Sequence, residues 1–282
     1  PSRFHLVNIR YLTQVEMTAG VLLLHGKKKL LFVDDRYTEK AKKEARRGIK
    51  VYHIKDLNQH VKRFKLVRFE ADDLTVARVT RWKKRFRGTK LMPSTGIIEK
   101  LRRVKQPGEI KTIEKACRIT DRVLREIPKK LKVGITEQTL AWKIAQLSHD
   151  FGAEDMAFET IVAFGPHSSR PHHRPTKRKL KKGDLVQIDM GVKVDGYCSD
   201  CSRVFFTGKP TNEQKEVFDL LVNTVRETTK KTKAGARNTT LDRFARKKIE
   251  EEGYGDNFLH SLGHGVGLEI HEGINLTSRL VG

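Results

Sequence analysis

The first third of the chain alternates short apolar runs with basic segments that have helical periodicity. The stretch Gly20–Asp35 is apolar on both sides of Gly26, which predicts two strands joined by a tight turn. Two later apolar runs, Ile49–Ile54 and Leu66–Phe69, also have the length and composition of strands. Strands that alternate with helices are typical of an α/β domain, so we predict an N-terminal α/β domain over residues 1–103.

A second domain, residues 104–282, begins where the hydrophobic pattern changes to helical spacing. This pattern starts after Pro107 and stops at Pro128, and proline is typical of both the first turn and the end of a helix. The fold class predicted for the whole chain is therefore α/β (α+β).

The second domain contains a repeated pattern. Gly134 precedes a helical pattern that ends at Gly152, and Gly235 precedes a second one of the same length that ends at Gly253. A longer helix precedes each copy, and a strand-like run with a Gly- and His-rich stretch follows it. We predict two duplicated helix–helix–strand halves that build one sheet backed by helices, with a site between them. A chance match between two helices is the alternative.

The segment Leu185–Phe206, LVQIDMGVKVDGYCSDCSRVFF, has the pattern of a hairpin with one converging acid in each arm. Asp195-Gly196 is a strong signal for a two-residue hairpin loop, and it sets the register of the two strands. In this register Asp189 and Asp200 lie on the same face as diagonal neighbours, about 5–8 Å apart.

Two carboxylates that converge on one face repel each other and are costly to desolvate. A positive partner is therefore expected, and it could be a nearby arginine, a shared proton or metal ions. The alternative is a pair of acids that are simply exposed on an edge hairpin.

The three cysteines indicate neither a disulfide framework nor a zinc site. Cys198 and Cys201 are three positions apart on a predicted strand, so their side chains point to opposite faces, and no second cysteine pair is present. An odd number of cysteines in a chain of 282 residues is typical of a reducing compartment. The sequence shows no export signal and no membrane span, so we predict a cytoplasmic protein without membrane association.

The net charge of +24 is concentrated in the N-terminal domain. Residues 1–103 contain 27 Lys and Arg against 10 Asp and Glu, while the remaining residues contain 31 against 24. Few aromatic residues are interleaved with these basic residues, and no nucleic-acid motif is present. We interpret the excess as a solvated basic face and keep association with nucleic acid or the ribosome as the alternative.

Histidines gather in two Gly- and Pro-rich stretches, PHH at Pro171–His173 and GHGVG at Gly263–Gly267, and His271 follows the second one. The glycines beside His264 allow the backbone to approach whatever this imidazole contacts. One imidazole and two carboxylates form a mixed ligand set that suits Mn, Co, Fe or Zn rather than Ca. Two metals about 3.5–4 Å apart with bridging carboxylates would neutralise both acids.

Three motifs together resemble one family. They are the hairpin with Gly-Tyr-x-Ser-Asp, the upstream FGPHSSRPHH and the later HSLGHGVGLEIHE. In this order they resemble the pita-bread metallopeptidases, and within that group the Xaa-Pro peptidases, aminopeptidase P and prolidase. NIRYLT at Asn8–Thr13 and FVDDRYTEKA at Phe32–Ala41 resemble the N-terminal domain of the same family. The resemblance covers nearly the whole chain and implies a creatinase/prolidase-like domain followed by a pita-bread domain with pseudo-twofold duplicated halves.

The resemblance implies a dinuclear metal centre on the hairpin. Asp189 would hold one metal ion, His264 would hold the other, and Asp200 would bridge both. The cofactors would be two divalent metal ions, Mn, Co or Zn. A hydroxide that bridges these ions would attack the first peptide bond of a peptide substrate with Pro in the second position.

His172 and His271 would be the catalytic, substrate-binding imidazoles. The resemblance implies that both line the substrate side, where they orient the scissile carbonyl and stabilise the tetrahedral oxyanion. His173 is the alternative to His172. A homodimer is also implied by the resemblance alone.

The chain departs from this family in its ligand set. Members supply two further glutamate ligands from strands downstream of the HGVG…HE motif, and one of them is the general base. This chain ends at Gly282 before either position, and Glu250–Glu252, Glu269 and Glu272 all precede it. The family's opening strand and helix before Asn8 are missing as well. We therefore expect a fragment of a longer parent, truncated at both ends and inactive as given.

Two functions from different classes follow. The leading hypothesis is that the intact parent is a metal-dependent exopeptidase for Xaa-Pro peptides. The alternative is a catalytically inactive pita-bread binding module whose basic N-terminal domain contacts nucleic acid or a protein partner. The three ligands and two site histidines favour the enzyme, and the basic excess favours the binding module. Relatives have a proline where this chain has Ile274, which affects the expected substrate preference but not the metal set.

Overall fold

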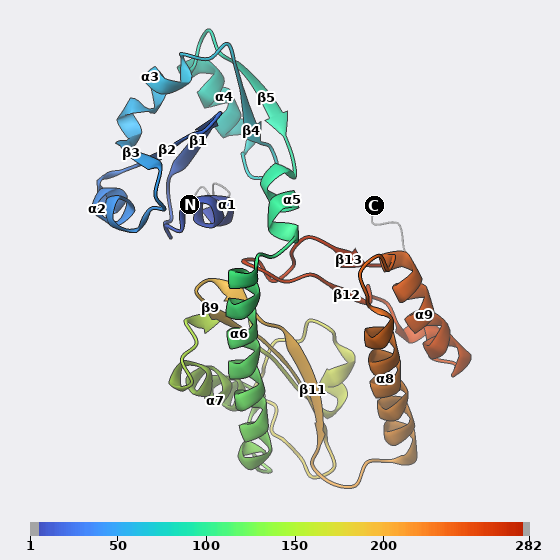
Figure 1. The fold of residues 1–282 in the computed structure, drawn as a ribbon. Coiled ribbons are helices and arrows are strands. Elements are labelled where there is room, and N and C mark those ends of the chain that lie inside the picture. The colour runs from blue at the N-terminus through green and yellow to red at the C-terminus, as the bar shows by residue number, and fades with distance from the viewer. Residues whose placement is uncertain (1–5, 279–282) are drawn as a thin grey trace. The chain divides into compact units, whose positions relative to one another are not determined.

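The computed structural model describes residues 6–278 and divides the chain into two compact units (Figure 1). The N-terminal unit comprises residues 1–102, and the C-terminal unit comprises residues 103–282. Each unit contains buried hydrophobic clusters of its own, as expected of separate domains.

The N-terminal unit contains the strands that the hydrophobic pattern predicts. β1 (Val21–His25) and β2 (Lys28–Val33) form an antiparallel hairpin, and Gly26 in its turn has a φ angle of 54°. β3 (Ile49–His53) pairs with β2 in parallel, and α2 (Asp35–Glu44) connects these two strands. A parallel pair joined by a helix confirms the predicted α/β character.

A second parallel pair completes the strands described in this unit. β4 (Leu66–Glu70) and β5 (Lys90–Ser94) are connected by α4 (Val76–Arg85). The sequence pattern does not predict β5, because Lys90 and Pro93 interrupt its apolar run. The remaining helices are α1 (Leu6–Thr13), the 3₁₀ helix η1 (Ile54–Asp56), α3 (Leu57–Val61) and α5 (Ile97–Arg103).

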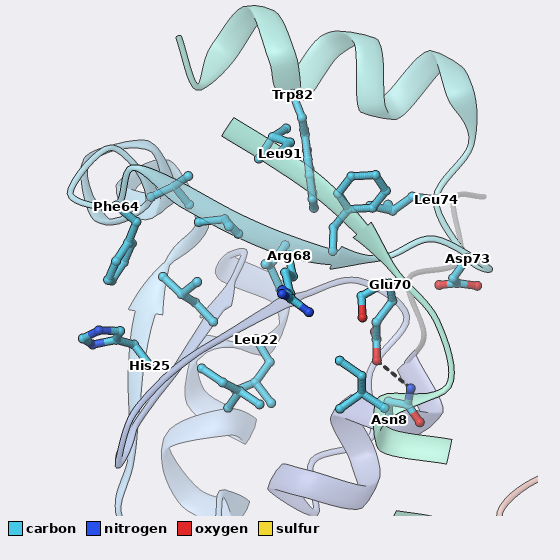
Figure 2. A pocket seen from close by; sticks show the side chains of 18 of the residues that line it. Asn8, Leu22, His25, Phe64, Arg68, Glu70, Asp73, Leu74, Trp82 and Leu91 are labelled. Carbon is cyan, nitrogen blue, oxygen red and sulfur yellow. Dashed lines mark hydrogen bonds between the residues drawn. The ribbon is translucent and has the colours of Figure 1, made fainter. Parts of the chain in front are cut away.

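A cavity of about 460 Å³ lies inside the N-terminal unit (Figure 2). It is lined by β1 and β4, which are edge strands of two different sheets among the described residues. Its walls are mainly apolar and include Leu22 and Trp82, while Asn8 Nδ2 donates a hydrogen bond to Glu70 Oε1 at 2.7 Å. His25, Glu70 and Asp73 also line it, but these described residues do not form a group close enough to hold a metal ion.

The C-terminal unit contains two pairs of helices with matching lengths. α6 (Pro107–Glu126) and α8 (Asn212–Lys231) each have 20 residues. α7 (Glu137–Asp150) and α9 (Asn238–Glu251) each have 14 residues. Figure 1 shows α6 with α7 and α8 with α9 as the two helical pairs of this unit. These lengths agree with the predicted duplication of the helical part of each half.

The predicted hairpin lies within two three-stranded antiparallel sheets, with the strand orders β7-β8-β11 and β6-β9-β10. The strands are β6 (Asp155–Met156), β7 (Ile161–Phe164), β8 (Leu185–Met190), β9 (Val192–Val194), β10 (Tyr197–Cys198) and β11 (Cys201–Phe206). α6 packs on β9 and α7 packs on β7, and this contact buries Val162, Ile188 and Met190 completely. The core face of the hairpin is therefore covered by helices, which leaves the acidic face for the site.

The strand predicted after α9 is much shorter than expected. Residues 258–262 form no strand, and β12 (Gly263–His264) pairs only with β13 (Asn275–Leu276) among the described residues. A strand requires neighbours that satisfy its main-chain groups, and only two residues on each side have such a neighbour here. The two halves therefore match in their helices but differ in their described strands.

Short 3₁₀ helices complete the described structure, namely η2 (Ile127–Lys130), η3 (Gly165–Ser169) and η4 (Gly255–Asn257). Within residues 6–278, no helix has both the length and the apolar composition that a membrane crossing requires.

Candidate metal centre

The hairpin has the register that its loop predicts. Ser202 lies opposite Asp189, and its Oγ donates a hydrogen bond to Asp189 Oδ1 at 2.8 Å. Asp195 and Gly196 form the two-residue loop with φ angles of 47° and 81°, the left-handed values that an Asp-Gly turn adopts. A local signal at the loop therefore determines the face on which the acids lie.

The strand pairing is interrupted beside Asp200. A Cβ atom at Gly191 would lie 1.9 Å from the main-chain oxygen of Ser199, so only glycine permits this close approach. Val192 N donates to Ser199 Oγ at 3.0 Å rather than to a main-chain oxygen. The interruption separates β8 from β9 and β10 from β11, and it releases Asp200 from the regular strand.

Asp200 lies between Asp189 and His264. Its Oδ2 is 3.3 Å from His264 Nε2. Burial raises the pKa of Asp200, the negative charge of Asp189 raises it further, and the imidazole of His264 opposes this effect. The structure thus brings together the three residues that the sequence proposes as metal ligands.

The site imidazoles gather on the same side. The rings of His264 and His271 meet edge to face, with 4.2 Å between their centroids. Burial lowers the pKa of His271, and the nearby His264 and His172 lower it further. His271 is therefore held in its neutral form at neutral pH, so that it has one N–H to donate and one nitrogen that accepts.

The two histidines of the PHH motif have different environments. His172 is exposed, whereas His173 is 5 % exposed and its Nε2 lies 2.9 Å from Glu137 Oε2. His173 is thus engaged in a hydrogen bond with a buried carboxylate. His172 is the imidazole of this motif that remains accessible, and its influence on the pKa of His271 places it near the predicted site.

Glu137 is a buried acid that the sequence analysis did not select. It is the first residue of α7 and has no exposed surface. Together with His167 and His173 it forms the one group of three acidic or imidazole side chains, among the described residues, whose ligand atoms are close enough to hold a metal ion. An acid after the Thr136 helix cap is an ordinary feature of a first helical turn, so the sequence offered no distinguishing signal.

Glu137 accepts hydrogen bonds from both sides of its carboxylate. Oε1 accepts from Phe164 N at 2.9 Å and His167 Nδ1 at 2.8 Å. Oε2 accepts from His173 Nε2, Thr176 N and Thr176 Oγ1 at 2.7–2.9 Å. Burial would raise the pKa of Glu137, but the hydrogen bonds outweigh it and lower this pKa to about 2. The group is therefore ionised at neutral pH.

Glu272 is also engaged by neighbouring groups. It is 6 % exposed, Lys105 Nζ donates to its Oε1 at 2.9 Å, and Glu269 N donates to its Oε2 at 3.2 Å. A Cβ atom at Gly267 would lie 2.2 Å from the Glu272 carboxylate, so the glycine makes room for this side chain. Glu272 thus stabilises the turn between His264 and His271.

The residue types of this donor set suit divalent cations. Asp189, Asp200 and His264 supply oxygen and nitrogen ligands, and Asp200 lies beside both of the others, but the three do not form a single group of ligand atoms that are mutually close enough to hold one ion. Burial raises the pKa of Asp200, and the negative charge of Asp189 raises it further. A bound cation would remove this repulsion and stabilise both carboxylates in their ionised form.

Two protein families match this chain. The model of the Metallopeptidase family M24 matches residues 111–280. The model of the Creatinase/Prolidase N-terminal domain matches residues 4–104. The two matches cover nearly all of the chain in the order in which its two units occur.

Individual relatives also match over most of the chain. An Xaa-Pro dipeptidase from Pyrococcus furiosus is 33 % identical, over 94 % of this chain and 77 % of the relative. The solved structure of an Xaa-Pro dipeptidase from Bacillus anthracis has a TM-score of 0.93 and 33 % identity, over 97 % of this chain and 78 % of that one. An X-Pro aminopeptidase from Thermotoga maritima has a TM-score of 0.90 and 32 % identity, over 97 % and 80 % of the two chains.

Proposed function

Because the chain belongs to the Metallopeptidase family M24 and carries a creatinase/prolidase N-terminal domain, we propose that it is a metal-dependent exopeptidase for Xaa-Pro peptides. The chain has the pita-bread fold of its structural relatives, preceded by the N-terminal domain. The observation that carries the proposal is the convergence of Asp189, Asp200 and His264, since these residues supply the mixed ligand set that a hydrolytic metal centre needs.

In this proposal Asp189 would hold one divalent ion, His264 would hold the other, and Asp200 would be a ligand of both. The ions, Mn, Co or Zn, would supply Lewis acidity and a hydroxide nucleophile at neutral pH. Glu272 is excluded from the ligand set because Lys105 neutralises it. As the family resemblance implies, two other glutamates would complete the set, and one of them would be the general base.

His172 and His271 would bind the substrate carbonyl. An exposed imidazole and a neutral one beside His264 can both donate hydrogen bonds to the oxygen that becomes negatively charged during hydrolysis. The named relatives include both an Xaa-Pro dipeptidase and an X-Pro aminopeptidase, so the proposed common feature is a proline in the second position of the substrate.

The test uses the full-length protein. With Mn, Co or Zn added, we expect release of the first residue from an Xaa-Pro dipeptide, an Xaa-Pro-Yaa tripeptide or both. Comparison of the two rates shows which substrate length the enzyme prefers. Asp200→Ala should abolish the activity and the calorimetric binding of the metal. Asp195→Asn is the matched control, because it changes an exposed acid in the loop of the same hairpin. Absence of metal-dependent cleavage across a panel of Xaa-Pro peptides would contradict the proposal.

The basic N-terminal domain supports the second candidate function, an inactive binding module for nucleic acid or a protein partner. Its 27 basic residues against 10 acidic ones would produce binding to RNA that weakens steeply with salt. Titration of labelled single-stranded RNA at 50 and 200 mM salt would detect it. A homodimer and a cytoplasmic location stay predictions.

A further inference from the structure

Glu137 holds one segment of the chain at four residues. The segment runs from Phe164 at the end of β7, through η3, to Thr176. The carboxylate accepts hydrogen bonds from Phe164 N at its start, from His167 and His173 within it, and from Thr176 at its end. The segment has little regular structure of its own. Arg178 Nε donates to Phe164 O and Gln138 N donates to Thr176 O at its two ends, and Glu137 is the group that also holds the histidines between them.

The hydrogen bonds leave the carboxylate no capacity for a metal ion. A carboxylate has about four lone-pair positions, and Glu137 already accepts five hydrogen bonds. Because the acid is ionised, His167 Nδ1 and His173 Nε2 both carry the protons that they donate. The short distances, 2.8 and 2.9 Å, are those of direct charge-assisted hydrogen bonds.

The contact with His173 also orients its neighbour. His173 is 5 % exposed, whereas His172 is exposed, so consecutive side chains diverge. His173 N donates to Arg170 O at 3.2 Å, which closes a turn around His172. The direction of the His172 side chain is therefore set by the burial of the adjacent imidazole against Glu137.

We propose that Glu137 is a positioning residue for His172. It fixes the segment between Phe164 and Thr176 so that His172 faces the substrate bound at Asp189, Asp200 and His264. This inference rests on the proposed function, in which His172 contacts the scissile carbonyl. Glu137 itself touches neither substrate nor metal.

A double-mutant cycle on the full-length protein tests this role. The four proteins are the wild type, Glu137→Gln, His172→Ala and the double variant, with kcat and KM measured on an Xaa-Pro dipeptide well below each melting temperature. His172→Ala should lower kcat about 100-fold, as expected for loss of an oxyanion donor. Glu137→Gln should lower kcat about 10- to 100-fold through displacement of His172, with KM nearly unchanged.

The double variant distinguishes a positioning role from a general structural one. If Glu137 acts through His172, the double variant should be no slower than His172→Ala. Multiplication of the two losses would overturn the proposal. The metal content of Glu137→Gln should equal that of the wild type, and loss of one metal equivalent would overturn the proposal in favour of a cation site at Glu137.

Two further variants keep the test decisive if Glu137→Gln fails to fold. Thr176→Val removes one hydrogen bond to Glu137 and keeps the shape of the side chain. We expect it to lower kcat less than Glu137→Gln does, and to have no further effect on kcat when His172 is already alanine. Ser148→Ala is the matched control, because Ser148 is a fully buried residue of α7 whose side chain donates to Ile144 O within its own helix. Its kcat should equal that of the wild type.

Amide hydrogen exchange provides a readout that does not depend on activity. In Thr176→Val and Glu137→Gln, amides of residues 165–176 should exchange faster while those of residues 185–206 stay protected. Unchanged exchange of residues 165–176 in an active protein would overturn the role of Glu137. Absence of activity in the wild type would instead contradict the proposed function, so the two failures are distinguishable.

Discussion

The two halves of the C-terminal unit stabilise their histidine-bearing segments by the same physical means but with different partners. In the first half, Glu137 on α7 accepts hydrogen bonds from the segment that carries His172. In the second half, Asp242 on α9 accepts hydrogen bonds from residues on both sides of His264. Both acids have no exposed surface. A buried carboxylate can thus organise an irregular segment that has too few strand partners of its own.

The second anchor is built around an arginine. Arg246 Nε donates to Asp242 Oδ2 at 2.9 Å, and Arg246 also donates to Phe258 O at 2.8 Å and His260 O at 2.6 Å. Asp242 Oδ1 accepts from Leu262 N at 3.2 Å, and its Oδ2 accepts from Ser278 N at 2.8 Å. The pair therefore satisfies main-chain groups over residues 258–262, where no strand forms.

The difference between the anchors does not follow from the repeat. Asn238 occupies in α9 the first helical position that Glu137 occupies in α7, and its Nδ2 donates to Asn275 O at 3.0 Å instead. The buried acid of the second half lies one turn later in its helix. Its partner is a permanent cation, whereas Glu137 is paired with imidazoles that can be neutral. Removal of one partner should therefore cost more free energy of unfolding at the Asp242–Arg246 pair than at Glu137.

The largest expected effect is that of Asp242→Ala. The side chain of Arg246 is 11 % exposed, and the substitution leaves its guanidinium without the paired carboxylate. Because an unpaired buried charge is costly, we expect a loss of about 3–5 kcal/mol in the free energy of unfolding. Urea denaturation of the variant and of Asp219→Ala, a control on an exposed acid of α8, measures it. A loss below about 1 kcal/mol would contradict the conclusion that the Asp242–Arg246 pair is the stronger of the two anchors.

A smaller loss, about 2 kcal/mol at pH 7, is expected for Glu137→Gln, since its imidazole partners carry no obligatory charge. The loss should depend on pH in a defined direction. The folded-state pKa of about 2 lies below the ordinary value of 4.5, so the ionised carboxylate stabilises the wild type above pH 4.5. This contribution is lost as the pH falls from 4.5 towards 2, and the glutamine variant does not titrate.

Urea denaturation of the wild type and Glu137→Gln at pH 7, 6, 5 and 4 measures the difference between the two proteins. It should be constant from pH 7 to 6 and should shrink as the pH drops through 4.5. A difference that grows at low pH would contradict the assignment of an ionised, hydrogen-bonded Glu137.

The smallest expected effect concerns the helix caps. The Thr136 side chain accepts a hydrogen bond from Thr139 N at the start of α7, whereas Arg237 at the same position of α9 makes no such bond. Thr136→Ala should cost about 1 kcal/mol, and Arg237→Ser should stabilise the protein by about 0.5–1 kcal/mol. Melting temperatures measure whether each variant is destabilised or stabilised, and a destabilising Arg237→Ser would contradict the expected gain from a side-chain cap at this position.

Elements with local signals were predictable in this chain. The Asp195-Gly196 loop and the alternation of apolar residues predicted the hairpin register, and the glycines that flank α7 and α9 predicted the matching helices. β5 was missed because its proline and lysine obscure the apolar pattern, and the strand expected over residues 258–262 is absent from the described structure. Strand formation there depends on neighbours that a local pattern does not reveal.

The residues of the candidate site also fall into those with a local signal in the sequence and those whose environment depends on distant residues. Hairpin register singled out Asp189 and Asp200, and the flanking glycines drew attention to His264, since both are local features. The roles of His172 and His271 were implied only by the family resemblance, and the ligand set stays a prediction. The contrast between the exposed His172 and the buried His173 was not accessible from the chain, because it depends on Glu137, a residue far away in the sequence and without a motif. A buried carboxylate becomes important through the hydrogen bonds that converge on it, and this convergence exists only in three dimensions.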